Sequence, residues 1–373
     1  MAITRIGNIA NTIPDDSIQN AKFSNIVQSK NIIINGGMDL AQRGTSQASI
    51  TSDNAIHTLD RYRTRLTTLG TWTQSQSTTV PSGQGFAKSL KMDCTTADAS
   101  PAAGDRLFIT QRFEGQMLQY LKKGTSNAQS LTLSFWVRSN KTGTYICELY
   151  DQNNSRHINK SYTISVADTW EKKTITYDGD TTGAFTNDNG NSLECAWWLG
   201  AGTTYTSGTL QTSWGSGTNA NRAVGQVNLA DSTSNEWYVT GVQLEAGTSA
   251  SDFEFLPYDV NLQRCQRYYH RLTSNGTYVG GGLVDNDNLN IIILIEYPVT
   301  MRTSPSALEQ SGTASEYRVR RDTTKTCTAV PVFNSATQHR TVVVFKASGH
   351  GWSTGNSAWG WLNGGYLGWS AEL

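Results

Sequence analysis

Residues 236–272 read EWYVTGVQLEAGTSASDFEFLPYDVNLQRCQRYYHRL. Apolar and polar residues alternate over the first nine positions, which predicts a strand with one buried face. A loop of small residues follows, and from about Asp259 the apolar spacing becomes helical. A strand, a loop and a basic helix in direct succession indicate the seam between two β-domains.

The helix predicted in this seam runs from Asp259, its expected N-cap, to Leu272. Apolar residues spaced by three and four are expected to pack on a neighbour: Leu262, Cys265, Tyr269 and Leu272. Basic residues fill the later turns: Arg264, Arg267, His270 and Arg271. Because cations offset the helix dipole at a C-terminus, this pattern favours a structural role over a ligand site.

Alternation is clearest in SLTLSFWVRS (130–139), where one face is expected to carry Leu131, Leu133, Phe135 and Val137. Similar runs predict strands at 58–66, 144–150, 170–178 and 193–200, and NIIIN (31–35) predicts a short strand ended by Gly36 and Gly37. Gly-, Asn- and Asp-rich turns separate these runs, as is typical of a jelly-roll sandwich. One short helix is expected at 115–124.

Strand patterns resume after the seam, at 276–284, 288–299, 316–322, 327–333, 340–347 and 365–373. We therefore predict an all-β protein with a jelly-roll sandwich over 31–257, a linker helix over 258–272 and a smaller β-domain over 273–373. Residues 1–30 contain too little apolar surface for a domain. They are expected to be an anchor that is ordered only against a partner.

Composition limits the possible functions of the 373-residue chain. The formal net charge is +0 and charged residues make up 16% of the chain, so charge-driven binding to nucleic acid or membranes is not expected. No secretory signal or membrane-spanning run is predicted. The cysteines are scattered and predict reduced, buried thiols in a protein that folds in a cytosol: Cys94, Cys147, Cys195, Cys265 and Cys327.

Several sequence blocks, taken in order, resemble one recurring type of bacteriophage tail-fibre or tail-tip virion protein. The blocks are NIIINGGMDLAQRGTS, TLDRYRT, LTLSFWVRS, DTWEKKTITYDGDTTG, GQVNLADSTSNEWYVTGVQLEAG, LQRCQRYYHRL, PVTMRTSPSAL and GYLGWSAEL. The resemblance covers about residues 31–373, and GVQLEAG followed by CQRYY is its most specific pairing. The first half also resembles carbohydrate-binding β-sandwich modules, which implies a galactose-binding-like jelly roll.

The resemblance implies a virion component on the host-facing apparatus that binds cell-surface glycans, as a homotrimer. Residues 1–30 would fit an anchor into a tail or baseplate partner. Two alternatives remain open: a capsid decoration or head-fibre protein that mainly packs against other virion proteins, and a depolymerase that cuts capsular polysaccharide.

Glycan binding needs flat aromatic rings that stack on the C–H face of a sugar, with amides or carboxylates for its hydroxyl groups. Aromatics inside alternating strands are expected to pack in the core: Trp136, Trp170, Trp197 and Trp237. Loop aromatics are better ligand candidates: Trp72, Tyr205 and Trp214. Such rings also fill domain or subunit contacts, so both roles remain open for them.

The stretch GHGWSTGNSAWGWLNGGYLGW (349–369) is the preferred recognition surface, because glycine lets loops display rings at unusual angles. Its candidate rings are Trp352, Trp359, Trp361, Tyr366 and Trp369, and its candidate hydroxyl partners are His350, Asn356 and Asn363. The alternative is that these rings pack a trimer axis or the core of their own domain.

Catalysis finds little support. GxSxG and HExxH are missing, the five histidines are isolated, and sequence cannot locate a glycosidase carboxylate pair among 30 acidic residues. DQNNS (151–155) lacks the later residues of a calcium loop, and Asp39 alone does not define a cation site. We therefore predict a protein that is not an enzyme and needs no metal or cofactor.

Overall fold

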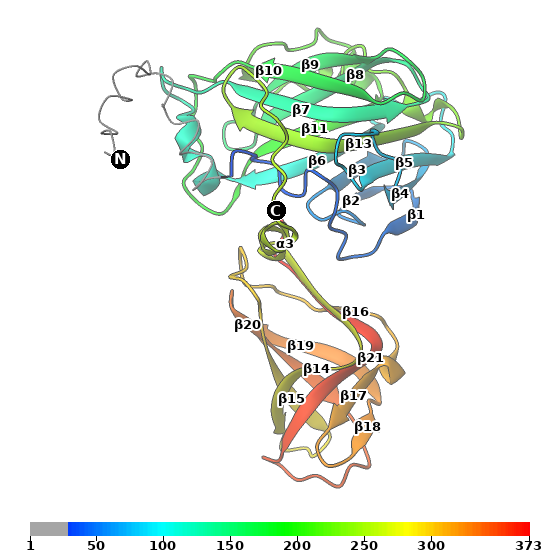
Figure 1. Cartoon of the computed structure of the whole chain (residues 1–373), viewed down its shortest axis with the longest axis vertical. Helices are drawn as coiled ribbons and strands as arrows, with labels where there is room; N and C mark the ends of the chain where they lie inside the picture. Colours follow the sequence, from blue (N-terminus) through cyan, green and yellow to red (C-terminus); the bar gives the residue numbers. More distant parts are fainter. Residues whose placement is uncertain (1–28) are drawn as a thin grey trace, which may run out of the picture.

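The computed structural model describes residues 29–373, apart from the side chains of Ser274 and Asn275, and is nearly all-β. Figure 1 shows a sandwich of two sheets, a smaller body built on a third sheet, and helix α3 (Tyr258–Gln266) between them. The anchor predicted at residues 1–30 lies outside the described residues, except for its last two positions.

The sandwich consists of two antiparallel sheets in a jelly-roll arrangement. The six-stranded sheet has the order β1 (Ser46–Ile50), β4 (Thr71–Ser77), β5 (Ser89–Thr96), β13 (Glu236–Ala246), β7 (Leu131–Ser139) and β10 (Glu171–Tyr177). The seven-stranded sheet has the order β12 (Gly215–Ser216), β9 (Arg156–Ile164), β8 (Gly143–Asp151), β11 (Asn191–Ala201), β6 (Arg106–Glu114), β3 (Arg63–Thr67) and β2 (Asp53–Ala55).

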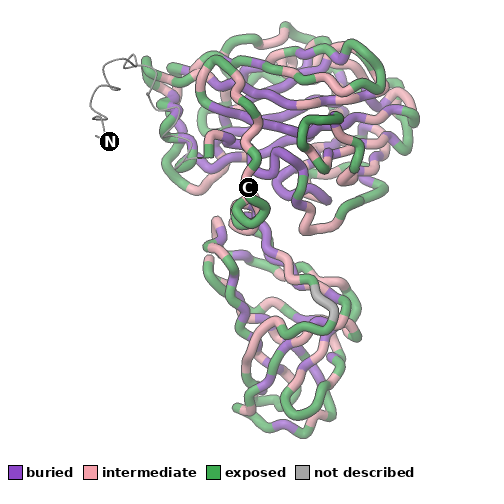
Figure 2. Tube along the Cα trace, in the orientation of Figure 1, coloured by how far each residue is buried: buried purple, intermediate pink, exposed green. Residues whose placement is uncertain are grey.

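Strand β7 shows how alternation builds this core. Phe135 and Val137 are fully buried between the sheets, whereas Trp136 and Arg138 are half-buried on the opposite side of the strand. Figure 2 shows buried segments running through the sandwich strands. The alternation predicted for 130–139 is therefore confirmed, because burying one face of a strand removes every second side chain from water.

Two short predicted elements are wrong. The segment 31–35 is buried but forms no strand, and isolated hydrogen bonds hold it along β13, such as that from Ile32 N to Leu244 O (2.8 Å). The helix predicted at 115–124 is instead two 3-10 turns, η3 (Gly115–Met117) and η4 (Gln119–Leu121). Lys122 follows with a left-handed backbone (φ 52°), which ends the second turn.

The third sheet consists of antiparallel strands after the seam. Its order is β18 (Thr324–Thr326), β17 (Tyr317–Arg320), β21 (Ser357–Ser370), β14 (Tyr269–Val284), β15 (Asn290–Glu296), β20 (Arg340–Lys346) and β19 (Ala329–Ala336), with β16 (Glu309–Gln310) paired to β21. Glycines let β14 and β15 approach closely. A Cβ at Gly280 or Gly282 would lie 2.3 or 1.7 Å from a main-chain oxygen of β15.

The seam helix is shorter than predicted, because α3 ends at Gln266. Tyr269 and His270 belong to β14, where they pair with Ser370 and Trp369 of β21. The long β14–β21 ladder satisfies the main-chain groups of these residues, so the helical spacing up to Leu272 is not realised as a helix.

The basic residues of the seam bind the two bodies together. Arg267 makes two hydrogen bonds to the carboxylate of Glu114 on β6, at 2.8 and 2.7 Å. Two contacts outside the seam add to this attachment: Arg302 donates to Asn189 O of the sandwich at 2.8 Å, and Arg61 of the sandwich pairs with the Glu372 side chain near the end of the chain. Figure 1 places this end beside α3. The structural role predicted for the seam cations is confirmed, although their partners are side chains and not only a helix dipole.

His270 gives this region a pH-dependent stability. Its ring is 5% exposed and stacks on Trp369 with 5.9 Å between ring centroids. Burial lowers the pKa of His270 to about 4. Since the unfolded chain binds a proton near pH 6.5, stability is full above that pH and falls as the pH drops toward 4.

We expect the wild type to lose about 2 kcal/mol of unfolding free energy between pH 7.5 and pH 5 relative to His270→Phe, which keeps a ring but cannot titrate. Urea unfolding of both proteins at the two pH values measures this difference. Equal losses in both proteins would contradict the assignment to His270.

Candidate functional site

Four of the predicted rings are buried, which corrects their assignment as ligand contacts. Trp72 lies on β4 and not in a loop, and its Nε1 donates to Leu69 O at 2.7 Å. Tyr205 is 7% exposed and its hydroxyl accepts a hydrogen bond from Arg106. The other two buried rings are those of Trp352 and Trp369. None of the four offers a face to a sugar.

Two further candidates are half-buried and already engaged. Trp214 donates from Nε1 to Asp178 O at 2.7 Å, and the Lys123 ammonium lies 5.4 Å from its ring centroid. The Arg271 guanidinium covers the Tyr366 ring at 3.5 Å. Both rings therefore serve intramolecular packing.

The three candidate hydroxyl partners in 349–369 differ in how far they are already hydrogen-bonded and buried. His350 stacks on Trp352 and its Nδ1 accepts the Trp352 main-chain N–H, at 3.0 Å. Asn356 accepts from Ser353 N through its side-chain oxygen. Asn363 lies half-buried on β21. The segment that contains most of the candidates is thus mainly a strand and not a glycine-rich display loop.

Trp359 and Trp361 come together on the outer face of this strand. Trp359 is 52% exposed, Trp361 is half-buried, and Tyr278 of the adjacent β14 is 45% exposed. The Tyr278 ring centroid lies 5.6 Å from that of Trp359 and 5.1 Å from that of Trp361. Because directly paired residues share one face of a sheet, the three rings form a continuous surface, here called the aromatic platform.

Glycine shapes the platform. Gly281 pairs with Trp359, and a Cβ at Gly281 would lie 3.4 Å from the nearest atom of the indole ring. The ring therefore lies across the β14 main chain with no side chain beneath it. A flat, open ring of this kind can stack on the apolar face of a sugar.

Two cations border the platform. Arg318 pairs with Trp361 and Arg320 pairs with Trp359, so both guanidiniums belong to the same face. The Arg320 guanidinium lies 5.6 Å from the Trp361 ring centroid. Within residues 29–373 neither side chain has a hydrogen-bond or ion-pair partner, so both can donate to hydroxyl groups of a ligand.

Sequence reasoning missed Tyr278, Arg318 and Arg320. Alternation in TYVGGG and EYRVRR indicates strands, but it does not reveal that these strands flank β21. The signal lies in the pairing of β14 and β17 with β21.

The remaining part of the same sheet face is aliphatic. Leu283 is 53% exposed, Leu294 40% and Val332 58%. The half-buried side chains on this surface are Ile292, Val342 and Val344. We call these six residues the aliphatic face. None of the six side chains is polar, and the polar neighbours on this face are small, such as Ser357 beside Leu283 and Ser335 beside Val342. The aliphatic face therefore suits an apolar partner better than a sugar.

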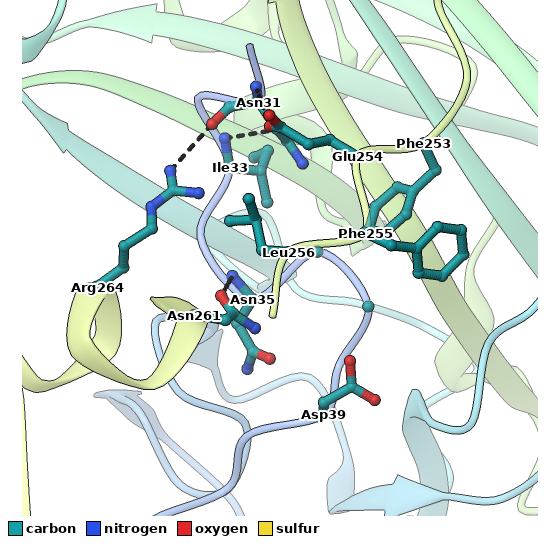
Figure 3. A pocket seen from close by; sticks show the side chains of 12 residues that line it. Asn31, Ile33, Asn35, Asp39, Phe253, Glu254, Phe255, Leu256, Asn261 and Arg264 are labelled. Atoms are coloured by element: carbon teal, nitrogen blue, oxygen red, sulfur yellow. Dashed lines mark hydrogen bonds between the residues drawn. The ribbon is translucent and has the colours of Figure 1, made fainter. Parts of the chain in front are cut away.

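A small pocket lies where the start of the described chain meets the segment before α3 (Figure 3). Most of its polar groups already have partners: Asn31 Nδ2 donates to Val242 O at 2.9 Å, and the Glu254 carboxylate accepts Asn31 N at 3.0 Å. Asp39 faces the pocket, and burial raises its pKa while Lys88 lowers it. The pocket mainly holds the first described residues on the sandwich.

The described residues contain no group of three or more His, Cys, Asp or Glu side chains arranged to hold a metal ion. All five cysteines are free and buried, as predicted. Burial raises the pKa of the Cys195 and Cys147 thiols, which disfavours reactive thiolates. No described helix has the length and apolarity to span a membrane.

No known protein-family profile matches the sequence, and no curated protein matches it. Among solved structures, the enzymatically active domain of tailspike protein 4 from bacteriophage CBA120 overlaps 58% of this chain, with 13% identity and a TM-score of 0.30. This match spans 21% of the tailspike chain.

Two carbohydrate-binding modules overlap the chain to a similar extent. TmCBM61, in complex with β-1,4-galactotriose, covers 58% of this chain and 99% of its own, with 8% identity and a TM-score of 0.29. The family 11 module of a Clostridium thermocellum cellulase covers 55% and 96%, with 11% identity and a TM-score of 0.25. At such low identities and TM-scores, these structures are similar to this chain in general architecture and no further. The resemblance to phage tail proteins remains a prediction.

Proposed function

We propose that this chain is a non-catalytic adhesin of a bacteriophage tail that binds host surface glycans through the aromatic platform. The observation that carries the proposal is the open Trp359 ring beside Tyr278, bordered by the Arg318 and Arg320 guanidiniums, which have no partner among residues 29–373. Rings supply the stacking surface, and the guanidiniums supply hydrogen bonds to hydroxyl groups.

The location is part of the same proposal. The chain acts in the virion, where residues 1–30 attach it to a tail or baseplate protein. Ser29 supports this arrangement, because its hydroxyl donates to Glu254 at 2.8 Å and so fixes the start of the described chain on the sandwich. The described chain thus begins on the sandwich, whereas the aromatic platform lies on β14 and β21 of the other body.

Binding of the purified chain to polysaccharide extracted from the host tests the proposal, together with an assay for newly formed reducing ends. We expect binding without release of reducing ends. Released ends would favour the depolymerase alternative. If the protein does not bind and electron microscopy finds it on the capsid, the decoration alternative is favoured.

Self-association through the aliphatic face completes the proposal, with three copies of the chain in the assembly. The aliphatic face lies on four strands, β14, β15, β20 and β19. Four strands by five residues cover roughly 300 Å², which is the size of the largest apolar patch on many monomers. Its rim carries both signs of charge, since Glu296 and Arg340 lie at one end and Lys346 at the other. Another copy offers the same apolar area and complementary charges. Several copies would convert weak sugar contacts into avidity.

The double substitution Leu294→Glu and Val332→Glu is expected to convert the oligomer to monomer, because two buried charges without partners oppose packing. Light scattering at micromolar concentration measures the change, and Thr323→Glu, which adds a charge at an exposed position of the same body, serves as a control. A wild type that is monomeric under these conditions would contradict the proposed self-association.

A further inference from the structure

A cation without a partner lies on the outer face of the seven-stranded sheet. Arg65 of β3 projects away from the core, since its neighbour Leu66 is buried between the sheets. It pairs with Phe108 on β6 and with Asn54 on β2. Across the described part of the chain, the Arg65 guanidinium has no hydrogen-bond or ion-pair partner, although the side chain is half-buried.

Other guanidiniums surround the same position. The centres of the Arg65, Arg106 and Arg222 guanidiniums lie 5.8, 5.9 and 5.9 Å from the Phe108 ring centroid. Among the described residues, the Arg106 guanidinium donates only to neutral hydroxyl groups, those of Tyr205 at 2.9 Å and of Thr67. Arg65 and Arg106 therefore place two positive charges without an acidic partner above one ring.

The acidic groups on this face are already committed. Glu148 accepts two hydrogen bonds from Arg222, both at 2.7 Å, and Glu194 pairs with Arg112 at 2.5 Å. Burial lowers the pKa of Arg65, Glu194 raises it, and Arg112, Arg106 and Arg222 lower it. An excess of positive charge thus remains around Arg65 that these carboxylates do not neutralise.

We propose that Arg65 and Arg106 bind the carboxylate or sulfate group of an acidic polysaccharide. A guanidinium presents two parallel N–H donors that match the two oxygens of such a group. The Phe108 ring below holds the cations partly out of water, which strengthens the interaction with an anion. The inference depends on the proposed function only for the class of ligand, because the site lies on the sandwich and not on the aromatic platform.

The layout favours a glycan over nucleic acid. A protein that binds single-stranded nucleic acid needs a row of cations along the sugar–phosphate backbone and exposed aromatic rings on which the bases stack. Here the charges without acidic partners gather at one point, and the Phe108 ring is 1% exposed. The chain as a whole carries a formal net charge of +0. A polysaccharide that brings one carboxylate or sulfate group to this point fits the cluster better than a nucleic-acid strand.

Titration calorimetry with polygalacturonate, dextran sulfate and neutral dextran tests the site in the full chain. We expect binding of at least one acidic polymer, and whichever binds identifies the acidic group. Arg65→Gln should weaken binding of that polymer roughly tenfold. Arg65→Lys should weaken it less, because lysine keeps the positive charge but lacks the two parallel N–H donors of a guanidinium. Since the Arg65 guanidinium bonds to no other residue in the range 29–373, these variants are expected to fold.

The matched control is Lys172→Gln, which removes one exposed positive charge from β10 on the opposite sheet. It should bind like the wild type. Binding by Arg65→Gln at wild-type strength, equal weakening by Lys172→Gln, no binding of either acidic polymer, or equally tight Arg65-dependent binding of single-stranded DNA would each overturn the proposal. Replacing Trp359 and Trp361 leaves the Arg65 site intact, so failure of the platform and failure of this site give different results.

Discussion

Replacing Trp359 and Trp361 together by alanine is expected to weaken glycan binding about 100-fold, since each stacked ring contributes on the order of 1–2 kcal/mol. The rings supply most of the apolar surface of the platform, and Tyr278 alone cannot cover a sugar face. Adsorption of the purified protein to host cells, measured as a binding isotherm, reports the loss.

The fold should survive this double substitution. Trp359 is 52% exposed and Trp361 is half-buried, so neither ring is a fully buried part of the core. Tyr258→Ala is the matched control, because Tyr258 is 65% exposed on α3, away from the platform. If the double variant adsorbs as strongly as the wild type, the aromatic platform is not the glycan-binding surface. Dissociation of the oligomer without loss of sugar binding would make the rings a subunit contact.

Arg267→Met is expected to cost about 3 kcal/mol of unfolding free energy, because it leaves a buried carboxylate without its cation. The Glu114 side chain is fully buried, and two of its hydrogen bonds come from Arg267. Urea denaturation at pH 7.5 measures the loss. The variant should also loosen the attachment of the smaller body to the sandwich, which limited proteolysis near residue 267 would detect.

The same pair has a defined pH dependence. Burial raises the pKa of Glu114, but hydrogen bonds from Arg267 and Tyr268 outweigh burial and lower its pKa overall. The stabilisation is therefore present above about pH 4.5 and is lost as the pH falls through the lowered pKa. Adding Glu114→Gln to Arg267→Met should recover part of the loss at pH 7.5. A double variant as unstable as the single one would show that the carboxylate charge is not the cause.

The sequence pattern alone was sufficient to predict the all-β fold class, because strands are recognised by the local periodicity of apolar residues. The alternation at 130–139 became β7, and the run at 236–244 became most of β13. Burial of one strand face imposes a period of two that is readable without coordinates. Long, clearly alternating strands were therefore predicted well, whereas 31–35 and 115–124 were too short for their patterns to decide the structure.

The candidate site was only partly predictable. Trp359 and Trp361 were chosen correctly as neighbours in a glycine-rich stretch, but nearby Trp352 is buried and donates to Asp322 at 2.9 Å. Side-chain type and spacing do not reveal which face of a strand meets the core when glycines and bulges shift the alternation. Exposure at these positions is decided by the strands that pair with β21.

By itself, the sequence determined that the chain is an all-β protein with a basic seam, because strand alternation and turn composition act over a few residues. Only the tertiary structure decided the partners of that seam and the members of the aromatic platform. Arg267 meets Glu114 across 153 positions, and Tyr278 meets Trp361 across 83. Contacts at such separations depend on strand order and register, which no local pattern encodes.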